Sequence, residues 1–253
     1  MKLKCSGISL ARLGSILLLT ACGGGGGAPT APVTPPVQQY AYGIWDSAIT
    51  KMLVLPNGAF YQWFGTAIPI GQLHGSLTVN ASNQLSYITS YGMYNGLYEQ
   101  NWTVTSSSIV TSSTLAYSAI GGVVSSPSTI RTYNFVFNNS YNSSFTNVDL
   151  TGSYSGISMG QNSTFSIDNA GIITGLYNSC SFNGTISPNA SKGYGLVSMT
   201  ISGVNCSSSS SGGPAIGYLI KSGSGVGQQL WIGVSEGLFT TTAYGYSLVG
   251  VKQ

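Results

Sequence analysis

The sequence predicts an all-β protein in which two tandem antiparallel β units, of about eight strands each, follow a flexible tether. Each unit is expected to be a small up-and-down barrel or a meander sheet. Three observations support this prediction. Apolar and polar residues alternate with a period of two over many short stretches, turn signals separate these stretches, and part of the pattern recurs 109 residues later.

The alternation is clearest in residues 73–80, 180–187 and 197–202. In the second of these stretches, Cys180, Phe182, Gly184 and Ile186 alternate with small polar residues. Because successive side chains of a strand point to opposite faces of its sheet, the pattern predicts one apolar and one polar face. In the first stretch the same rule places His74 on the polar face, so we expect this histidine to be exposed.

Turn signals lie between the predicted strands. Residues 55–58 read Leu-Pro-Asn-Gly, and residues 168–171 read Asp-Asn-Ala-Gly. After residue 21, no apolar stripe with helical spacing extends beyond three turns. Strands joined by short loops pair with antiparallel neighbours, and eight of them can close into a barrel without exposed edges.

An internal repeat suggests that the two units are copies. Residues 74–82 parallel residues 183–191, and the same offset of 109 places Gly43 and Trp45 on Gly152 and Tyr154. We therefore expect one unit over residues 40–139 and a second over residues 146–253. Sequence rich in Ser and Asn also produces such matches by chance, so duplication is one of two interpretations.

The first 21 residues have the three parts of an export signal. Lys2, Lys4 and Arg12 give a positive start, residues 13–19 form an apolar core too short to span a bilayer, and Thr20-Ala21 are small. These parts are common to signals for soluble secretion and signals for lipoprotein export, so both interpretations are open on this pattern alone.

The string Leu17-Leu18-Leu19-Thr20-Ala21-Cys22 resembles the lipobox of bacterial lipoproteins. The resemblance implies that residues 1–21 are a signal peptide and that Cys22 is the first residue of the mature protein. It also implies diacylglycerol on the Cys22 sulfur and a fatty acid such as palmitate on its amine. Gly23 and Gly24 stand where Gram-negative lipoproteins retained in the inner membrane favour Asp, so the resemblance implies an outer-membrane anchor, on the periplasmic or the cell-surface side.

Residues 22–39 are predicted to form the tether. Five glycines follow Cys22, and four prolines favour extended polyproline II further along. At about 3 Å per residue, the tether can hold the folded part up to roughly 50 Å from the membrane.

Units of this strand number, on a lipid anchor, resemble the small barrels of lipocalins and of surface lipoproteins such as transferrin-binding protein B. Gly43-Ile44-Trp45 echoes the Gly-x-Trp signature of lipocalins. The resemblance implies a fold and does not transfer a ligand.

Charge excludes some partners. Three of the eight basic residues leave with the predicted signal, and the remaining five balance five acidic residues. A neutral chain lacks the basic footprint of a nucleic-acid-binding protein and a polybasic anchor for anionic lipid. The expected partners are therefore the membrane, through Cys22, and an unidentified protein or glycan.

Two cysteines remain after Cys5 and Cys22 are assigned to the signal and the anchor. In an exported protein, Cys180 and Cys206 predict a disulfide. Such a bond closes a loop of about 27 residues and stabilises by roughly 3–4 kcal/mol on the chain-entropy model. Half of a metal site is the alternative, but the chain has one histidine. We expect no metal and no cofactor.

No catalytic constellation is predicted. Residues 156–160 and 233–237 match the nucleophile-elbow pattern G-x-S-x-G, but His74 precedes both serines, whereas α/β-hydrolases place the histidine last. A glycosidase needs two facing carboxylates. Asp149 and Asp168 are interpreted as turn residues, and Asp46 as a local partner of Lys51. A hydrolase is thus the least favoured function.

Aromatic residues leave a binding function open. The chain has 16 tyrosines and four tryptophans, including a group of tyrosines at positions 87, 91, 94 and 98. Such rings stack on sugars or peptides when exposed, or fill the faces of β-sheets. The sequence favours a non-catalytic lipoprotein with a structural or surface-contact role; the alternative is a ligand-binding barrel for a small apolar molecule or a glycan.

Overall fold

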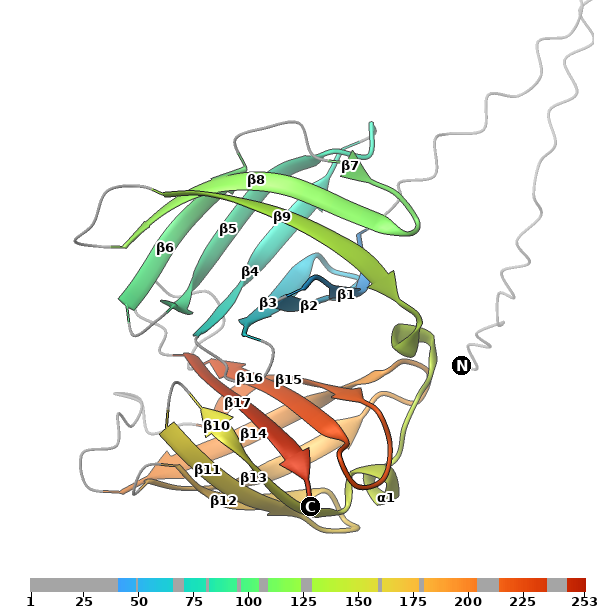
Figure 1. Ribbon diagram of the computed structural model, residues 1–253, viewed down its shortest axis with the longest axis vertical. Coiled ribbons are helices and arrows are strands. Elements are labelled where there is room, and N and C mark those ends of the chain that lie inside the picture. Colours follow the sequence, from blue (N-terminus) through green and yellow to red (C-terminus); the bar gives the residue numbers. More distant parts are fainter. Residues whose placement is uncertain are drawn as a thin grey trace, which may run out of the picture. The chain divides into compact units, whose positions relative to one another are not determined.

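The computed structural model describes residues 41–48, 50–65, 71–80, 82–94, 97–104, 109–123, 129–158, 161–177, 180–203, 214–235 and 245–253. Strands dominate these ranges, and they form two β units (Figure 1). The predicted fold class is therefore confirmed. The predicted signal peptide and tether, residues 1–39, lie outside the described residues.

The first β unit, which we call the N-terminal sheet, is antiparallel throughout and has the order β6-β5-β4-β3-β2-β1-β9-β8-β7. Strand β6 also pairs with β8, so the pairings run in a closed circuit of eight strands, with the short β7 as an additional strand beside β8. The strands are β1 (Gly43–Asp46), β2 (Thr50–Val54), β3 (Ala59–Phe64), β4 (Gly71–Val79), β5 (Leu85–Tyr94), β6 (Leu97–Val104), β7 (Ile109–Val110), β8 (Thr114–Val123) and β9 (Thr129–Asn138).

The second β unit, the C-terminal barrel, is a closed antiparallel barrel in which each strand pairs with its neighbours in the chain and β17 returns to β10. A 3-10 helix, η1 (Asn139–Asn142), and a short helix, α1 (Asn147–Leu150), connect the two units. The barrel strands are β10 (Gly152–Ser158), β11 (Gln161–Ile167), β12 (Ile172–Tyr177), β13 (Cys180–Pro188), β14 (Tyr194–Ser202), β15 (Ala215–Ser222), β16 (Gln229–Ser235) and β17 (Gly245–Lys252).

Apolar side chains fill the interior of each unit. Along β11, Ser163, Phe165 and Ile167 are buried and the residues between them are exposed, as a period of two requires. The interior side chains form one contiguous hydrophobic cluster in each unit, around Trp45 in the N-terminal sheet and around Tyr154 in the C-terminal barrel. Each large side chain buried in this way contributes about 1.5–3 kcal/mol.

The two predicted turns are present and share their geometry. Gly58 donates its backbone N–H to Leu55 O at 2.9 Å, and Gly171 donates to Asp168 O at 3.0 Å. Their φ angles are +83° and +82°, a region that favours glycine. Strands β4 and β13 also begin and end 109 residues apart. These matches are what a duplication predicts, and the duplication itself stays a prediction.

Some strands are buried on both faces. All six residues of β3 are buried, as are the first five of β4 and the last six of β16. The cause is a third hydrophobic cluster, in which the outer faces of β1–β3 meet those of β15–β17. Residues 37–253 accordingly form one compact unit.

Candidate functional site

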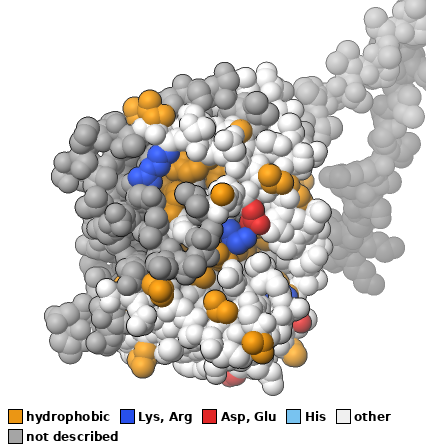
Figure 2. All heavy atoms as spheres, in the orientation of Figure 1, with side chains coloured by type: hydrophobic (Ala, Val, Ile, Leu, Met, Phe, Trp, Pro, Cys, Tyr) orange, Lys and Arg blue, Asp and Glu red, His pale blue; other side chains and the backbone are white. Residues whose placement is uncertain are grey.

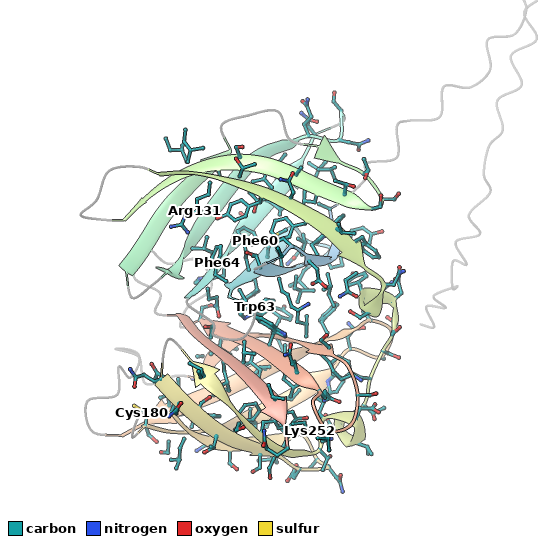
Figure 3. All side chains as sticks on the ribbon, viewed as in Figure 1. Phe60, Trp63, Phe64, Arg131, Cys180 and Lys252 are labelled. Carbon is teal, nitrogen blue, oxygen red and sulfur yellow. The ribbon has the colours of Figure 1, made fainter. Side chains whose placement is uncertain are left out.

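The contact between the N-terminal sheet and the C-terminal barrel, which we call the seam, is aromatic. The Tyr61 and Tyr218 rings meet edge to face with centroids 5.3 Å apart, and Lys51 Nζ lies 5.7 Å from the centre of the Trp231 ring. Trp63 lies between the two units, whereas Phe60 and Phe64 of the same strand lie inside the N-terminal sheet (Figure 3). The buried seam residues are Ile44, Leu53, Leu55, Ala59, Tyr61, Trp63, Tyr141, Ile220, Trp231 and Val249.

His74 is part of this contact, so the prediction that it is exposed is wrong. Its side chain is 1% exposed and its ring is stacked on Tyr61, with centroids 5.9 Å apart. The alternation does place His74 on the outer face of β4, but the seam covers that face. Burial lowers the pKa of His74 to about 4 and raises the pKa of Tyr61 to about 12, because both charged forms lose solvation.

Ser235, from the second G-x-S-x-G string, also lies in the seam region. It ends strand β16 and is 1% exposed. A nucleophilic serine must be reachable by substrate, and this one is sealed by packing. Of the first string, Ser158 ends strand β10, while its side chain and residues 159–160 lie outside the described residues.

A glycine allows the two units to approach closely at the seam. Trp63 and Gln72 are cross-strand partners on β3 and β4. A Cβ atom placed on Gly233 of β16 would lie 2.6 Å from Gln72 Oε1 and 2.8 Å from Trp63 Nε1. Glycine is therefore required here by space and not by its backbone angle.

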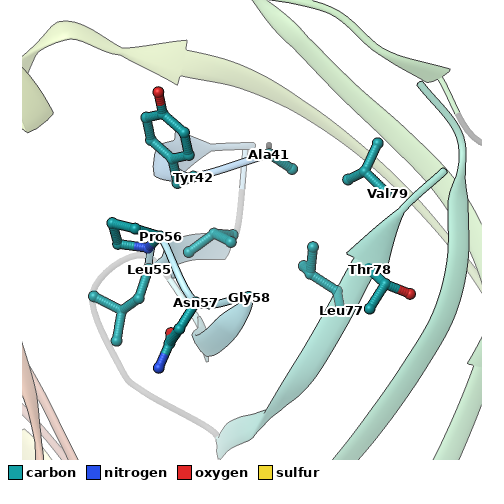
Figure 4. A pocket seen from close by; sticks show the side chains of 10 residues that line it. Ala41, Tyr42, Leu55, Pro56, Asn57, Gly58, Leu77, Thr78 and Val79 are labelled. Atoms are coloured by element: carbon teal, nitrogen blue, oxygen red, sulfur yellow. The ribbon is translucent and has the colours of Figure 1, made fainter. Parts of the chain in front are cut away.

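A pocket of about 300 Å³ lies at one end of the N-terminal sheet (Figure 4). Its buried wall consists of apolar side chains from the segment before β1, from β2 and from β4, and its exposed rim includes Tyr42, Pro56, Asn57 and Thr78. None of its ten lining residues is charged. They are Ala41, Tyr42, Val54, Leu55, Pro56, Asn57, Gly58, Leu77, Thr78 and Val79.

The described carboxylates have structural partners, and the interpretations of Asp46 and Asp168 are confirmed, whereas Asp149 lies in helix α1 and not in a turn. Asp46 pairs with Lys51 at 2.8 Å and also accepts a hydrogen bond from Asn138 Nδ2 at 2.7 Å. Asp168 Oδ1 accepts from two backbone N–H groups of its turn. Hydrogen bonds from the Thr146 backbone N–H and hydroxyl lower the pKa of Asp149, which caps α1. Glu99 and Glu236 lie outside the described side chains.

The predicted site cysteines are only partly described. Cys22 and Cys206 lie outside the described residues. Cys180 is the first residue of β13 and is 8% exposed. Strand β13 pairs with β14, with Ser181 opposite Ser202, so the chain leaves β14 at the end of the barrel where Cys180 lies. The Cys180–Cys206 bridge stays a prediction.

Some tyrosines fill the interior of a unit and others are exposed, so both interpretations of the aromatic residues, packing and ligand contact, apply. Tyr117 donates its hydroxyl to Gln62 Oε1 at 3.2 Å inside the N-terminal sheet, and Tyr154 fills the C-terminal barrel. Tyr42 is 41% exposed at the pocket rim. Tyr87, Tyr91, Tyr94 and Tyr98 belong to β5 and β6, but their side chains lie outside those described.

Sequence reasoning missed the seam and the pocket. A signal for the seam exists, because β3 reads Ala-Phe-Tyr-Gln-Trp-Phe and so lacks the alternation of a strand with one wet face. Within the described residues, no helix is long and apolar enough to span a bilayer, and no three His, Cys, Asp or Glu side chains group as metal ligands.

Comparison with known proteins found no family model, no curated protein and no solved structure that matches this chain.

Proposed function

We propose that this chain is an outer-membrane lipoprotein, anchored through Cys22, whose β units have a structural or surface-contact role without catalysis. The observation that carries the proposal is the string Leu19-Thr20-Ala21-Cys22 at the end of an apolar core, followed directly by five glycines and then by prolines. A diacylated and N-acylated cysteine holds a protein firmly, because several chains insert together.

The packed interiors support a display role. The side chains inside each unit touch one another in a single hydrophobic cluster, which gives each unit a rigid shape to present. The described carboxylates and the serine at the end of β16 are engaged in turns, pairs or packing, and not gathered around a shared cleft.

The outer surface of the C-terminal barrel supports contact with an uncharged partner. Strands β11–β14 contain no charged residue, and their exposed positions carry Ser, Thr, Asn, Gln and a few aliphatic side chains. Neighbouring hydroxyls pair across strands, as in Ser166–Thr174 at 3.2 Å and Ser181–Ser202 at 3.0 Å. Uncharged side chains also dominate the face in Figure 2. Such a surface suits a neutral glycan or protein better than nucleic acid.

Metabolic labelling with a fatty acid tests the anchor. The wild-type chain is expected to take up label, and Cys22→Ser is expected to lose both the label and the signal-peptide cleavage that depends on it. Cys5→Ser is the matched control, because it removes a cysteine from the predicted signal and leaves Cys22 in place. Equal labelling of wild type and Cys22→Ser would exclude the proposed anchor.

A further inference from the structure

The N-terminal sheet and the C-terminal barrel differ at the end that lies just before their first strands, β1 and β10. Trp45 Nε1 donates to the carbonyl of Ala41 at 2.8 Å, and Tyr154 Oη donates to the carbonyl of Leu150 at 2.6 Å. In both cases the acceptor lies four residues before the donor. Ala41 therefore occupies in the N-terminal sheet the place that Leu150 occupies in the C-terminal barrel.

The C-terminal barrel closes this end with its own side chains. Leu150, at the end of α1, is fully buried, and Phe145 joins it in the interior cluster. Helix α1 also rests on the nearby turn, since a Cβ placed on Gly171 would lie 2.7 Å from Asn147 Nδ2. The barrel end is thus filled by an aromatic and a branched aliphatic side chain.

The N-terminal sheet has the pocket at this end. Leu77 donates its backbone N–H to Gly58 O at 2.9 Å, as Ile186 does to Gly171 O at 2.8 Å, so the walls correspond. A Cβ on Gly58, however, meets only the Leu77 backbone among the described residues. Ala41 has three carbons fewer than Leu150, and the pocket opens beside it.

We propose that this pocket binds a small uncharged apolar molecule, an aryl or alkyl body, in the place that Phe145 and Leu150 fill in the C-terminal barrel. The proposal goes beyond the structural or contact role of the protein and does not depend on the anchor at Cys22. The apolar wall includes Val54, Leu77 and Val79, which also belong to the interior cluster of the sheet.

Size and charge define the ligand class. A dry cavity of about 150 Å³ accommodates benzene, so the pocket of about 300 Å³ suits a ligand of roughly ten non-hydrogen atoms. An ion buried there would have no charged partner among the lining residues, and burial of an unpaired charge is costly. The exposed rim at Tyr42, Asn57 and Thr78 gives access from water and leaves room for a hydroxyl group on the ligand.

Calorimetric titration with 2-naphthol tests the proposal. We use the chain without residues 1–22, so that neither the apolar signal segment nor acyl groups nor detergent compete for the pocket; residues 37–253 form a compact unit without them. One molecule is expected to bind per chain. Ala41→Leu, which copies the residue of the C-terminal barrel, is expected to weaken binding by roughly tenfold or more, because it fills the pocket.

Val148→Leu is the matched control. Val148 is 69% exposed on α1, so an added methylene there should leave the affinity unchanged. Circular dichroism checks that each variant folds. If Ala41→Leu does not fold, Val79→Phe narrows the pocket from another wall and is expected to give the same loss.

Three results would overturn the proposal. The first is no binding by the parent chain, and the second is equal binding by the parent and the pocket-filling variant. The third is binding that begins only after residues 37–40 are deleted, because the chain's own segment would then be the natural occupant.

Discussion

His74 is stacked on its cross-strand partner Tyr61, with ring planes 23° apart, in the seam between the N-terminal sheet and the C-terminal barrel. A histidine in this place must be neutral, because protonation would put a charge where water does not reach it. The stability of the contact between the two units therefore depends on pH through this pair.

Stability is expected to fall as the pH drops from about 6.5 towards 4. The folded pKa of His74 is about 4, below the ordinary value of 6.5, so within this window the unfolded chain binds a proton that the folded chain does not. The shift corresponds to a loss of about 3 kcal/mol by pH 4. Urea unfolding at a series of pH values measures this loss.

The variant His74→Asn isolates the contribution of the histidine to this pH dependence. Asparagine stands at the matching position 183 of β13 and does not titrate. We expect the loss between pH 6.5 and pH 4 to shrink markedly in this variant, while any loss below pH 4 from Asp149 stays. An unchanged pH profile would show that His74 is not the group responsible.

Gly233→Ala is expected to destabilise the seam. The new Cβ would approach Gln72 Oε1 and Trp63 Nε1 at 2.6 and 2.8 Å, so both side chains, or the backbone of β16, must move. Overpacking of this kind costs about 1–3 kcal/mol. Chemical denaturation gives the cost, and a change in tryptophan fluorescence, to which Trp63 contributes, accompanies it.

A double-mutant cycle with Gln72→Ala tests whether the cost of Gly233→Ala comes from the contact with the Gln72 side chain. Removing the amide relieves the contact with Gln72 Oε1 and leaves the contact with Trp63 Nε1, so the two changes together should cost less than the sum of their separate costs. Strict additivity would indicate that the cost comes from the contact with Trp63 and not from the contact with Gln72.

The turn glycines of both units are expected to resist substitution. Gly58→Ala and Gly171→Ala both force an alanine to a positive φ and bring its Cβ to 2.5 and 2.6 Å from a carbonyl oxygen of β4 or β13. Both should lower the melting temperature, and Gly171→Ala by more, because its Cβ would also lie 2.7 Å from Asn147 Nδ2. A larger effect at Gly58 would argue against this geometric account.

The sequence was sufficient for the fold class because alternation reports on local structure. Along β11 and β13 each apolar residue faces the interior, as the period of two predicts. The burial of His74 could not be predicted from the sequence. Alternation assigns a side chain to one face of a sheet, but it does not indicate whether another part of the protein covers that face. The pocket could not be predicted either. It is recognised only when the surroundings of Ala41 in the N-terminal sheet are compared with those of Leu150 in the C-terminal barrel, and the sequence does not give those surroundings.

The last prediction concerns Cys180 and Cys206. Cys180 begins β13 with its side chain buried, and Ser181 pairs with Ser202 on β14. Cys206 follows Ser202 by four residues, a distance that a short loop can fold back. A bridge would hold this end of the β13–β14 pair closed and remove loop entropy from the unfolded chain, which amounts to roughly 3–4 kcal/mol. Reduction should therefore destabilise the C-terminal barrel. Intact-mass measurement after alkylation without reductant decides the matter, because alkyl groups found on both cysteines would rule the bridge out.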